Sequence, residues 1–250
     1  TLGTDIASKA APDGYTLLLG NISLAFNPAL YKKLPYNSLR DLIPVSLVVD
    51  QPNIMVVHPS LPAKNLKEFI ALARNPSSKM SYASAGLGSG THLAMEMLLL
   101  DLKINMVHVP YKGTGPSLTA VLGNEVPVFL STFASALPHV KAGRLRTYGV
   151  TTAKRAAALP EAPTIAEAGV PGFEYSTWYG LLAPAGTPRA IIDKLNKTAV
   201  AQLNSAEMRQ RYVSQGMDPI PSTSAEFVAK MTSETEKWAK VVQAAKISQQ

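Results

Sequence analysis

The sequence lacks cysteine, has few charged residues and contains no long hydrophobic run. Without cysteine, the chain can form neither disulfides nor thiolate metal sites. No apolar run reaches the roughly 18 residues that a membrane-spanning helix needs, and no signal peptide is visible. The four histidines are far apart in sequence and form no H-x-x-H or H-E-x-x-H pair. The sequence therefore predicts neither a metal site nor a cofactor.

The composition is typical of a well-buried globular protein, with 46% hydrophobic and 16% charged residues. The net charge is +7. Lysine and arginine are scattered singly or in pairs, such as Lys32–Lys33, whereas a nucleic-acid surface normally clusters them. We therefore expect no nucleic-acid partner, and we interpret the excess charge as a mildly basic face that attracts anions.

Extended apolar runs alternate with helical patterns along most of the chain. Residues 15–19 indicate a buried strand after a Pro-Asp-Gly turn, and Asn27–Pro28 is typical of a helix start. Two extended pieces, 45–49 and 54–57, are separated by Pro52, which predicts a bend or a sheet edge. Strands that alternate with helices predict βαβ units, a mostly parallel sheet and hence an α/β fold.

Two proline-marked extended stretches divide the chain, one near His58–Pro59 and one near Phe173–Ser176. They predict a continuous domain II over 60–175. The flanking residues, 1–59 and 176–250, would form a discontinuous domain I. Because the chain crosses twice between the domains, we expect a hinge and a cleft.

The stretch YASAGLGSGTH, residues 82–92, follows an apolar run and precedes an amphipathic one. Its glycines let backbone N–H groups come close to a ligand, and its hydroxyls add hydrogen-bond donors. The helix that begins near Gly90 presents free N–H groups and the positive end of its dipole. These features favour binding of an anion by Ser84, Gly86, Gly88, Ser89, Gly90 and Thr91. The alternative, a flexible turn with an ordinary Ser or Thr cap, stays open.

The same stretch matches no nucleotide-binding or catalytic motif. GLGSG is not followed by Gly-Lys-Ser/Thr, so it is not a Walker loop, and no acidic residue completes a dinucleotide fingerprint. Ser89 and His92 could form a pair, but the G-x-S-x-G elbow is absent. Glu96 is expected on a solvated helix face. We therefore predict that the protein is not an enzyme.

Several stretches together closely resemble the extracytoplasmic solute receptors of tripartite tricarboxylate transporters, the Bug family. The resemblance runs in order over essentially the whole chain. It is carried by APDGYTLLLGN, NPALYKKLPY, VVHPSLP, SYASAGLGSGTHLAMEML, VHVPYKG, SALPHVKAGRLR, LPEAPTIAEAGVPGFE and WYGLLAPAGTP.

The resemblance implies a type II periplasmic-binding-protein fold, in which two α/β domains close on a ligand across a hinge and cleft. It implies a small carboxylate as the ligand: a di- or tricarboxylate, an amino acid or an aromatic acid. It also implies membrane transporter subunits as partners and a location in the periplasm after removal of a signal peptide.

The family pattern begins with a strand, a Pro-Gly-Gly loop, a helix and a second strand. In this sequence TLGTD, at residues 1–5, resembles the start of the family's second helix. The resemblance therefore leads us to expect that domain I lacks the family's N-terminal segment, whose loop normally contacts the carboxylate.

The resemblance also assigns ligand contacts outside the glycine-rich stretch. Ser131 and Thr132 stand where the family usually has Asp-Asn, so an acid and an amide are missing from the predicted site. The other assigned residues are Asn21 and Ser23 after the first strand, and Trp178 and Tyr179 on the second crossing. For Trp178, plain packing between the domains is an equal alternative.

A second function fits the same expected fold. The effector domains of LysR-type regulators share it, so the chain could be the ligand-sensing domain of a regulator. A helix-turn-helix would indicate that function, and the sequence contains none.

Overall fold

The computed structural model describes residues 1–247, and the chain divides into two compact units. The first unit combines Thr1–Asp50 with the chain from Thr177 onwards, and the second is Gln51–Ser176. The sequence placed the boundaries after residues 59 and 175. The first boundary of the structure instead falls inside a strand, because the proline at 59 follows the end of that strand and not the end of the unit.

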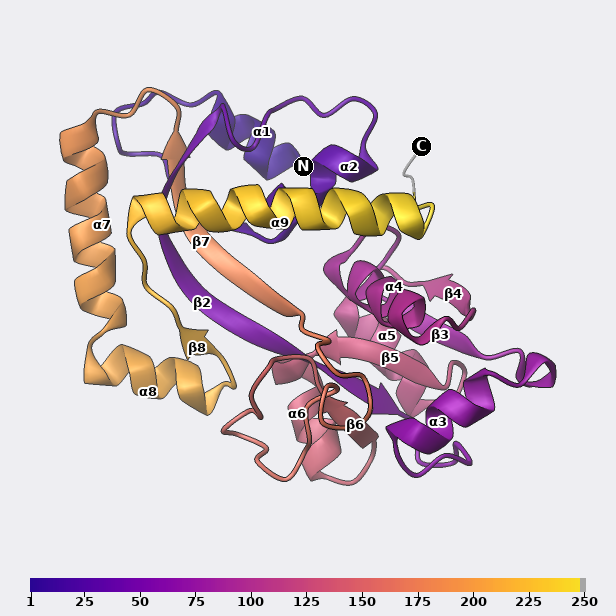
Figure 1. Cartoon of the computed structure of the whole chain (residues 1–250). Helices are drawn as coiled ribbons and strands as arrows, with labels where there is room; N and C mark the ends of the chain where they lie inside the picture. Colours follow the sequence, from indigo (N-terminus) through magenta and orange to yellow (C-terminus); the bar gives the residue numbers. More distant parts are fainter. Residues whose placement is uncertain (248–250) are drawn as a thin grey trace. The chain divides into compact units, whose positions relative to one another are not determined.

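The described residues of the first unit form a small antiparallel sheet with five helices around it (Figure 1). β1 (Leu18–Asn21) pairs with β7 (Ser176–Pro184), and the first part of β2 (Leu42–Val57) pairs with the short β8 (Asp218–Pro219). The helices of this unit are α1 (Leu2–Ser8), α2 (Ser23–Leu30), α7 (Arg189–Leu203), α8 (Ala206–Ser214) and α9 (Ser224–Ala244).

The long helix α9 packs on α2 and on the face of β7 (Figure 1). A capping box formed by Thr223 and Glu226 fixes its start. Trp238 meets the edge of Phe26 at a ring-centroid distance of 6.0 Å, and Phe227 meets Trp178 at 5.4 Å. All four rings are buried, so α9 supplies much of the core of this unit.

The second unit is a mixed sheet with helices on its faces. Its strands are the second part of β2, then β3 (Ser81–Ser84), β4 (Val107–Pro110), β5 (Val128–Thr132) and β6 (Arg146–Val150). Its helices are α3 (Leu66–Ala73), the 3-10 turn η1 (Pro76–Ser78), α4 (Gly90–Leu102), α5 (Thr114–Leu122) and α6 (Phe133–Lys141).

Strand direction decides where the loops of the second unit meet. β3 runs parallel to β4 and to β5, whereas β5 and β6 run antiparallel to β2. The carboxyl ends of β3, β4 and β5 therefore lie at one edge of the sheet. A core that includes Ile54, Phe129 and Phe133 holds this sheet to its helices.

Three local expectations were wrong. The first strand begins at Leu18, and Tyr15 is 93% exposed in a turn closed by the Asp13 side chain. The helix expected to have Asn27 as its N-cap and Pro28 as its first residue begins five residues earlier, at Ser23, and contains Pro28. Burial of Leu24, Ala25 and Phe26 outweighs the local Asn-Pro signal there.

Pro52 does not break the chain into two extended pieces, because β2 is continuous over Leu42–Val57. Proline has no N–H to donate to a strand ladder. Pro52 follows Val49 and Asp50, which pair with β8, and precedes Asn53, where pairing with β5 begins. The missing donor thus falls between two paired stretches.

Over residues 1–247, none of the helices combines the length and the apolar character required to cross a lipid bilayer.

Candidate functional site

Three helix N-termini meet at the carboxyl edge of the parallel strands of the second unit. α4 follows β3, α5 follows β4, and α6 follows β5. In open α/β sheets this edge is the usual place for a ligand, because loops and helix N-termini converge there. The glycine-rich stretch singled out in the sequence is the connection from β3 to α4.

Most hydrogen-bond donors of this loop are used inside it. The N–H of Ala85 donates to Thr91 Oγ1 at 2.9 Å, and the N–H of Gly86 donates to Ser84 Oγ at 3.1 Å. The N–H of Gly88 donates to Nδ1 of His92 at 3.1 Å, and the N–H of Ser89 donates to the Gly86 carbonyl at 3.1 Å. Three of these four bonds end on side chains of the loop or of the first turn of α4, and these bonds define the shape of the loop.

Two backbone donors remain at the start of α4. Ser89 is the N-cap, and its hydroxyl accepts from the N–H of His92. Across the part of the chain that the structure describes, the N–H groups of Gly90 and Thr91 have no acceptor. They point along the axis of a 13-residue helix, so they coincide with the positive end of its dipole. This pair of amides can hold an anionic oxygen.

The three glycines of the loop are required for different structural reasons. Gly86 and Gly88 have φ of +131° and +69°, backbone conformations that favour glycine. A Cβ on Gly90 would lie 2.7 Å from the Tyr175 hydroxyl oxygen. The small size of residue 90 therefore serves contact with Tyr175, and the other two glycines serve the shape of the loop.

Two histidines lie beneath the loop, stacked on each other. The rings of His92 and His108 are 3.9 Å apart and tilted by 11°, and Tyr82 stacks on His108 at 5.0 Å. Nε2 of His108 hydrogen-bonds Ser84 Oγ at 2.6 Å. The hydroxyl of Tyr82 donates to Glu96. Glu96 is therefore half-buried and bonded, and the expectation of a simply solvated face was wrong.

Burial keeps these side chains in their neutral forms. Burial, and secondly the neighbouring His108, lower the pKa of His92 to about 4, and burial also lowers the pKa of His108. Burial, followed by the hydrogen bond to Glu96, raises the pKa of the Tyr82 phenol. His92 is 3% exposed, so a proton on it would place a charge inside the unit.

The depressed pKa of His92 predicts a loss of folding stability in acid. The unfolded chain takes up a proton near the ordinary value of 6.5, whereas the folded chain does so only near 4. Stability from this group is therefore complete above pH 6.5 and falls as the pH drops toward 4. Between pH 7.5 and pH 5 we expect this group to remove about 2 kcal/mol from the free energy of unfolding.

Urea denaturation at both pH values measures this effect, with His92→Asn as the reference because asparagine does not titrate. The native chain should lose about 2 kcal/mol more than the variant between pH 7.5 and pH 5. Equal losses in the two proteins would contradict a depressed pKa at His92.

Ser131 and Thr132 lie at the end of β5, at the same sheet edge. Ser131 is fully buried, and its hydroxyl donates to the Thr132 carbonyl at 3.2 Å. Thr132 is the N-cap of α6, and its hydroxyl donates to Ser135 Oγ at 3.0 Å instead of capping the helix. Thr132 is thus the more accessible of the two.

The remaining predicted residues belong to the first unit. The Asn21 side chain accepts from the N–H of Ser23 at 2.9 Å, where β1 ends and α2 begins. Asn21 is also the strand partner of Tyr179. Trp178 is fully buried against Phe227, and its indole N–H has no acceptor within the described residues. Burial raises the pKa of Tyr179, so its phenol stays protonated.

The sequence did not predict the support beneath the loop. His92 and His108 are 16 residues apart in the sequence, and their rings stack. They come together because β3 and β4 are neighbouring strands in a register that places Tyr82 opposite His108. One local signal was available: His92 lies three residues after the N-cap Ser89, within reach of the loop backbone. No group of three or more His, Asp or Glu side chains placed to hold a metal ion occurs in the described residues.

Solved structures with this fold include three that are similar over nearly the whole chain. Rpa4515 of R. palustris, solved with adipate, is 32% identical with a TM-score of 0.91, covering 99% of this chain and 84% of that one. The periplasmic binding protein BugD is 32% identical with a TM-score of 0.87 and the same coverage. MatC of Rhodopseudomonas palustris, with bound malate, is 31% identical with a TM-score of 0.85, covering 97% and 84%.

The fold is therefore that of the periplasmic binding proteins of this type, as the sequence predicted. A family model described as the tripartite tricarboxylate transporter family receptor, TctC, matches residues 1–247. The chain belongs to this family of receptors, and the resemblance to the Bug proteins is confirmed.

Proposed function

We propose that this protein is an extracytoplasmic solute receptor, not an enzyme, that binds a small organic carboxylate at the loop between β3 and α4. The observation that carries the proposal is that the amides of Gly90 and Thr91, at the start of α4, have no acceptor within residues 1–247. A carboxylate has two oxygens, and each can accept from one amide. The hydroxyls of Ser89 and Thr91 are hydrogen-bonded to each other at 3.1 Å beside these amides, so one of their two protons stays free to donate to a ligand.

The relatives support a dicarboxylate as the ligand. Rpa4515 was solved with adipate and MatC with malate, and each of these ligands carries two carboxylates on a short chain. In this chain we assign one carboxylate to the amides of α4. The other predicted contacts, Thr132 and Ser131 in the second unit and Asn21, Ser23, Trp178 and Tyr179 in the first, stay proposals for the rest of the ligand.

The family of this chain and the description of BugD as a periplasmic binding protein support a cellular location and a transporter partner. We propose that the receptor works in the periplasm and delivers its ligand to the membrane subunits of a tripartite tricarboxylate transporter. The alternative function, the ligand-sensing domain of a regulator, has no comparable support, because the matching family is one of receptors.

Calorimetry with adipate and malate tests the proposal, with adipamide as a control that keeps the length of adipate and removes both charges. We expect a dissociation constant on the order of micromolar for at least one of the two acids, and no measurable binding of adipamide. Binding of adipamide as tight as that of adipate, or no binding of either acid, would overturn the proposal.

A further inference from the structure

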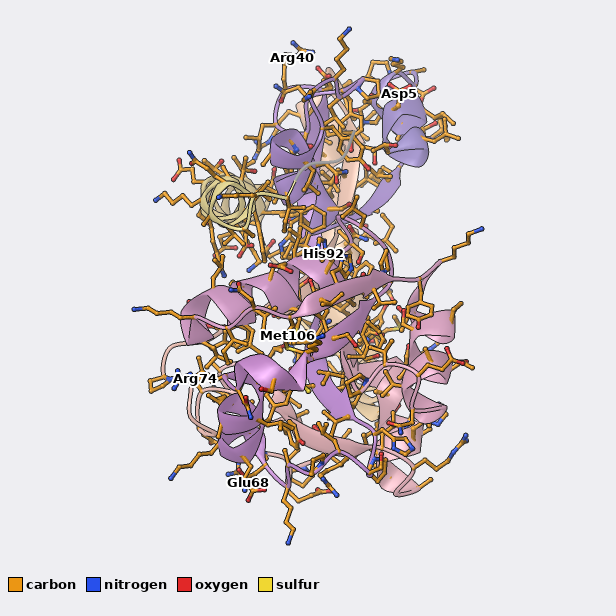
Figure 2. All side chains as sticks on the ribbon, turned by 90° about the vertical axis from the view of Figure 1, so that its right-hand side faces the viewer. Asp5, Arg40, Glu68, Arg74, His92 and Met106 are labelled. Carbon is orange, nitrogen blue, oxygen red and sulfur yellow. The ribbon has the colours of Figure 1, made fainter. Side chains whose placement is uncertain are left out.

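His92 contacts the backbone of the candidate loop directly, although its side chain is buried. It lies on the first turn of α4, is labelled in Figure 2, and is 3% exposed. Its Nδ1 is 3.1 Å from the amide nitrogen of Gly88, four residues earlier. Gly88 has φ of +69°, so this contact holds the loop at a point where the backbone takes an unusual conformation.

The chemistry of this contact fixes the tautomer of the imidazole. A backbone N–H can only donate, so Nδ1 of His92 must carry a free lone pair. The ring proton is therefore on Nε2, which faces Oε1 of Glu96 at 3.9 Å. Glu96 also accepts from Tyr82, so the carboxylate that faces the ring is itself held in place.

His108 contacts the loop at Gly86 indirectly, through the side chain of Ser84. His108 stacks on His92 and hydrogen-bonds Ser84 Oγ at 2.6 Å, and that hydroxyl accepts from the N–H of Gly86 at 3.1 Å. His92 thus bonds the Gly88 amide directly, whereas His108 reaches the Gly86 amide only through the Ser84 hydroxyl. The charged or titratable groups that face His92 are Glu96 from α4, His108 from β4 and Tyr82 from β3.

We propose that His92 is a positioning residue for ligand binding: its unprotonated Nδ1 turns the Gly88 amide inward and leaves the amides of Gly90 and Thr91 as the pair that meets the carboxylate. This inference rests on the proposed function. Without the acceptor, the Gly88 amide loses its partner and the loop loses the bond that fixes its turn. The depressed pKa of His92 is consistent with this role, because a protonated ring cannot accept.

Two substitutions separate the acceptor from the bulk of the side chain. His92→Asn places an oxygen near the position of Nδ1 and can still accept, whereas His92→Leu fills space without an acceptor. We expect His92→Leu to weaken adipate binding by ~10- to 100-fold and His92→Asn to change it by less than ~3-fold. Malate replaces adipate if the native chain binds only malate. Equal affinities of the native chain and His92→Leu for the acid that binds would overturn the inference.

A measurement without ligand tests the contact itself. In the native chain labelled with ¹⁵N, a scalar coupling across the hydrogen bond should join the Gly88 amide nitrogen to Nδ1 of His92 at pH 7. The coupling should vanish, and the Gly88 amide signal should shift, as the pH falls through about 4. In His92→Asn the Gly88 signal should not follow that titration.

The coupling measurement and the binding measurement test the two proposals separately. Absence of the coupling at pH 7 would overturn the role of His92, whatever the ligand. A native chain that shows the coupling but binds neither adipate nor malate would overturn the proposed function, and with it the link from His92 to a ligand.

Discussion

Substitution of Gly88 by valine is expected to lower the affinity for a carboxylate by ~10- to 100-fold. Gly88 has φ of +69°, which a β-branched residue adopts only with strain of about 1–3 kcal/mol. The loop relieves that strain by leaving its native turn, which also breaks the bond from the Gly88 amide to His92. Isothermal calorimetry with adipate measures the loss.

Gly143→Val is the matched control for this experiment. Gly143 has φ of +68°, and a Cβ there would have no neighbour within 4 Å. It lies after α6, outside the β3–α4 loop, so the same backbone strain should reduce folding stability without changing affinity. If both variants bind equally weakly, the effect of Gly88→Val reports general destabilisation; if both bind like the native chain, the shape of the loop is irrelevant to the ligand.

Substitution of Trp238 by alanine is expected to lower the free energy of unfolding by about 3–5 kcal/mol. Trp238 is fully buried, meets Phe26 edge to face at 6.0 Å, and donates from its indole nitrogen to Glu234 at 2.7 Å. Its removal leaves a cavity where α9 packs on α2. Urea denaturation followed by circular dichroism measures the change.

Lys240→Ala on the same helix is the control. Lys240 is exposed, so its loss should cost less than ~0.5 kcal/mol. A similar cost for both substitutions would mean that the helix itself, and not the Trp238 ring, stabilises the first unit.

The glycine-rich loop could be predicted from the sequence because its signals are local. Ser89 before Gly90 marks the helix start, and the structure places the N-cap there. Two other elements show equally local causes: Leu66, Phe69 and Ala73 are buried at helical spacing in α3, and Gly143 follows α6 in the left-handed conformation that a helix end favours. In each case the residues that decide the structure are within a turn of one another.

Features set by distant partners could not be predicted. The start of α2 depends on α9, some 200 residues later in the chain, which makes burial of Phe26 outweigh the Asn-Pro signal. β2 passes through Pro52 because its two halves pair with different strands. The stack of His92 on His108 requires β3 and β4 to be neighbours in a particular register, which no local pattern encodes.

The most direct measurement of the site follows the backbone amides of the second unit during a titration with adipate at pH 7. In ¹H–¹⁵N spectra the signals of Gly90 and Thr91 should shift and saturate together, as expected for two amides that donate to a carboxylate at the start of α4. The signal of Gly88, whose amide is bonded to His92, should change little. Saturable binding that leaves the Gly90 and Thr91 signals in place would show that the carboxylate binds elsewhere.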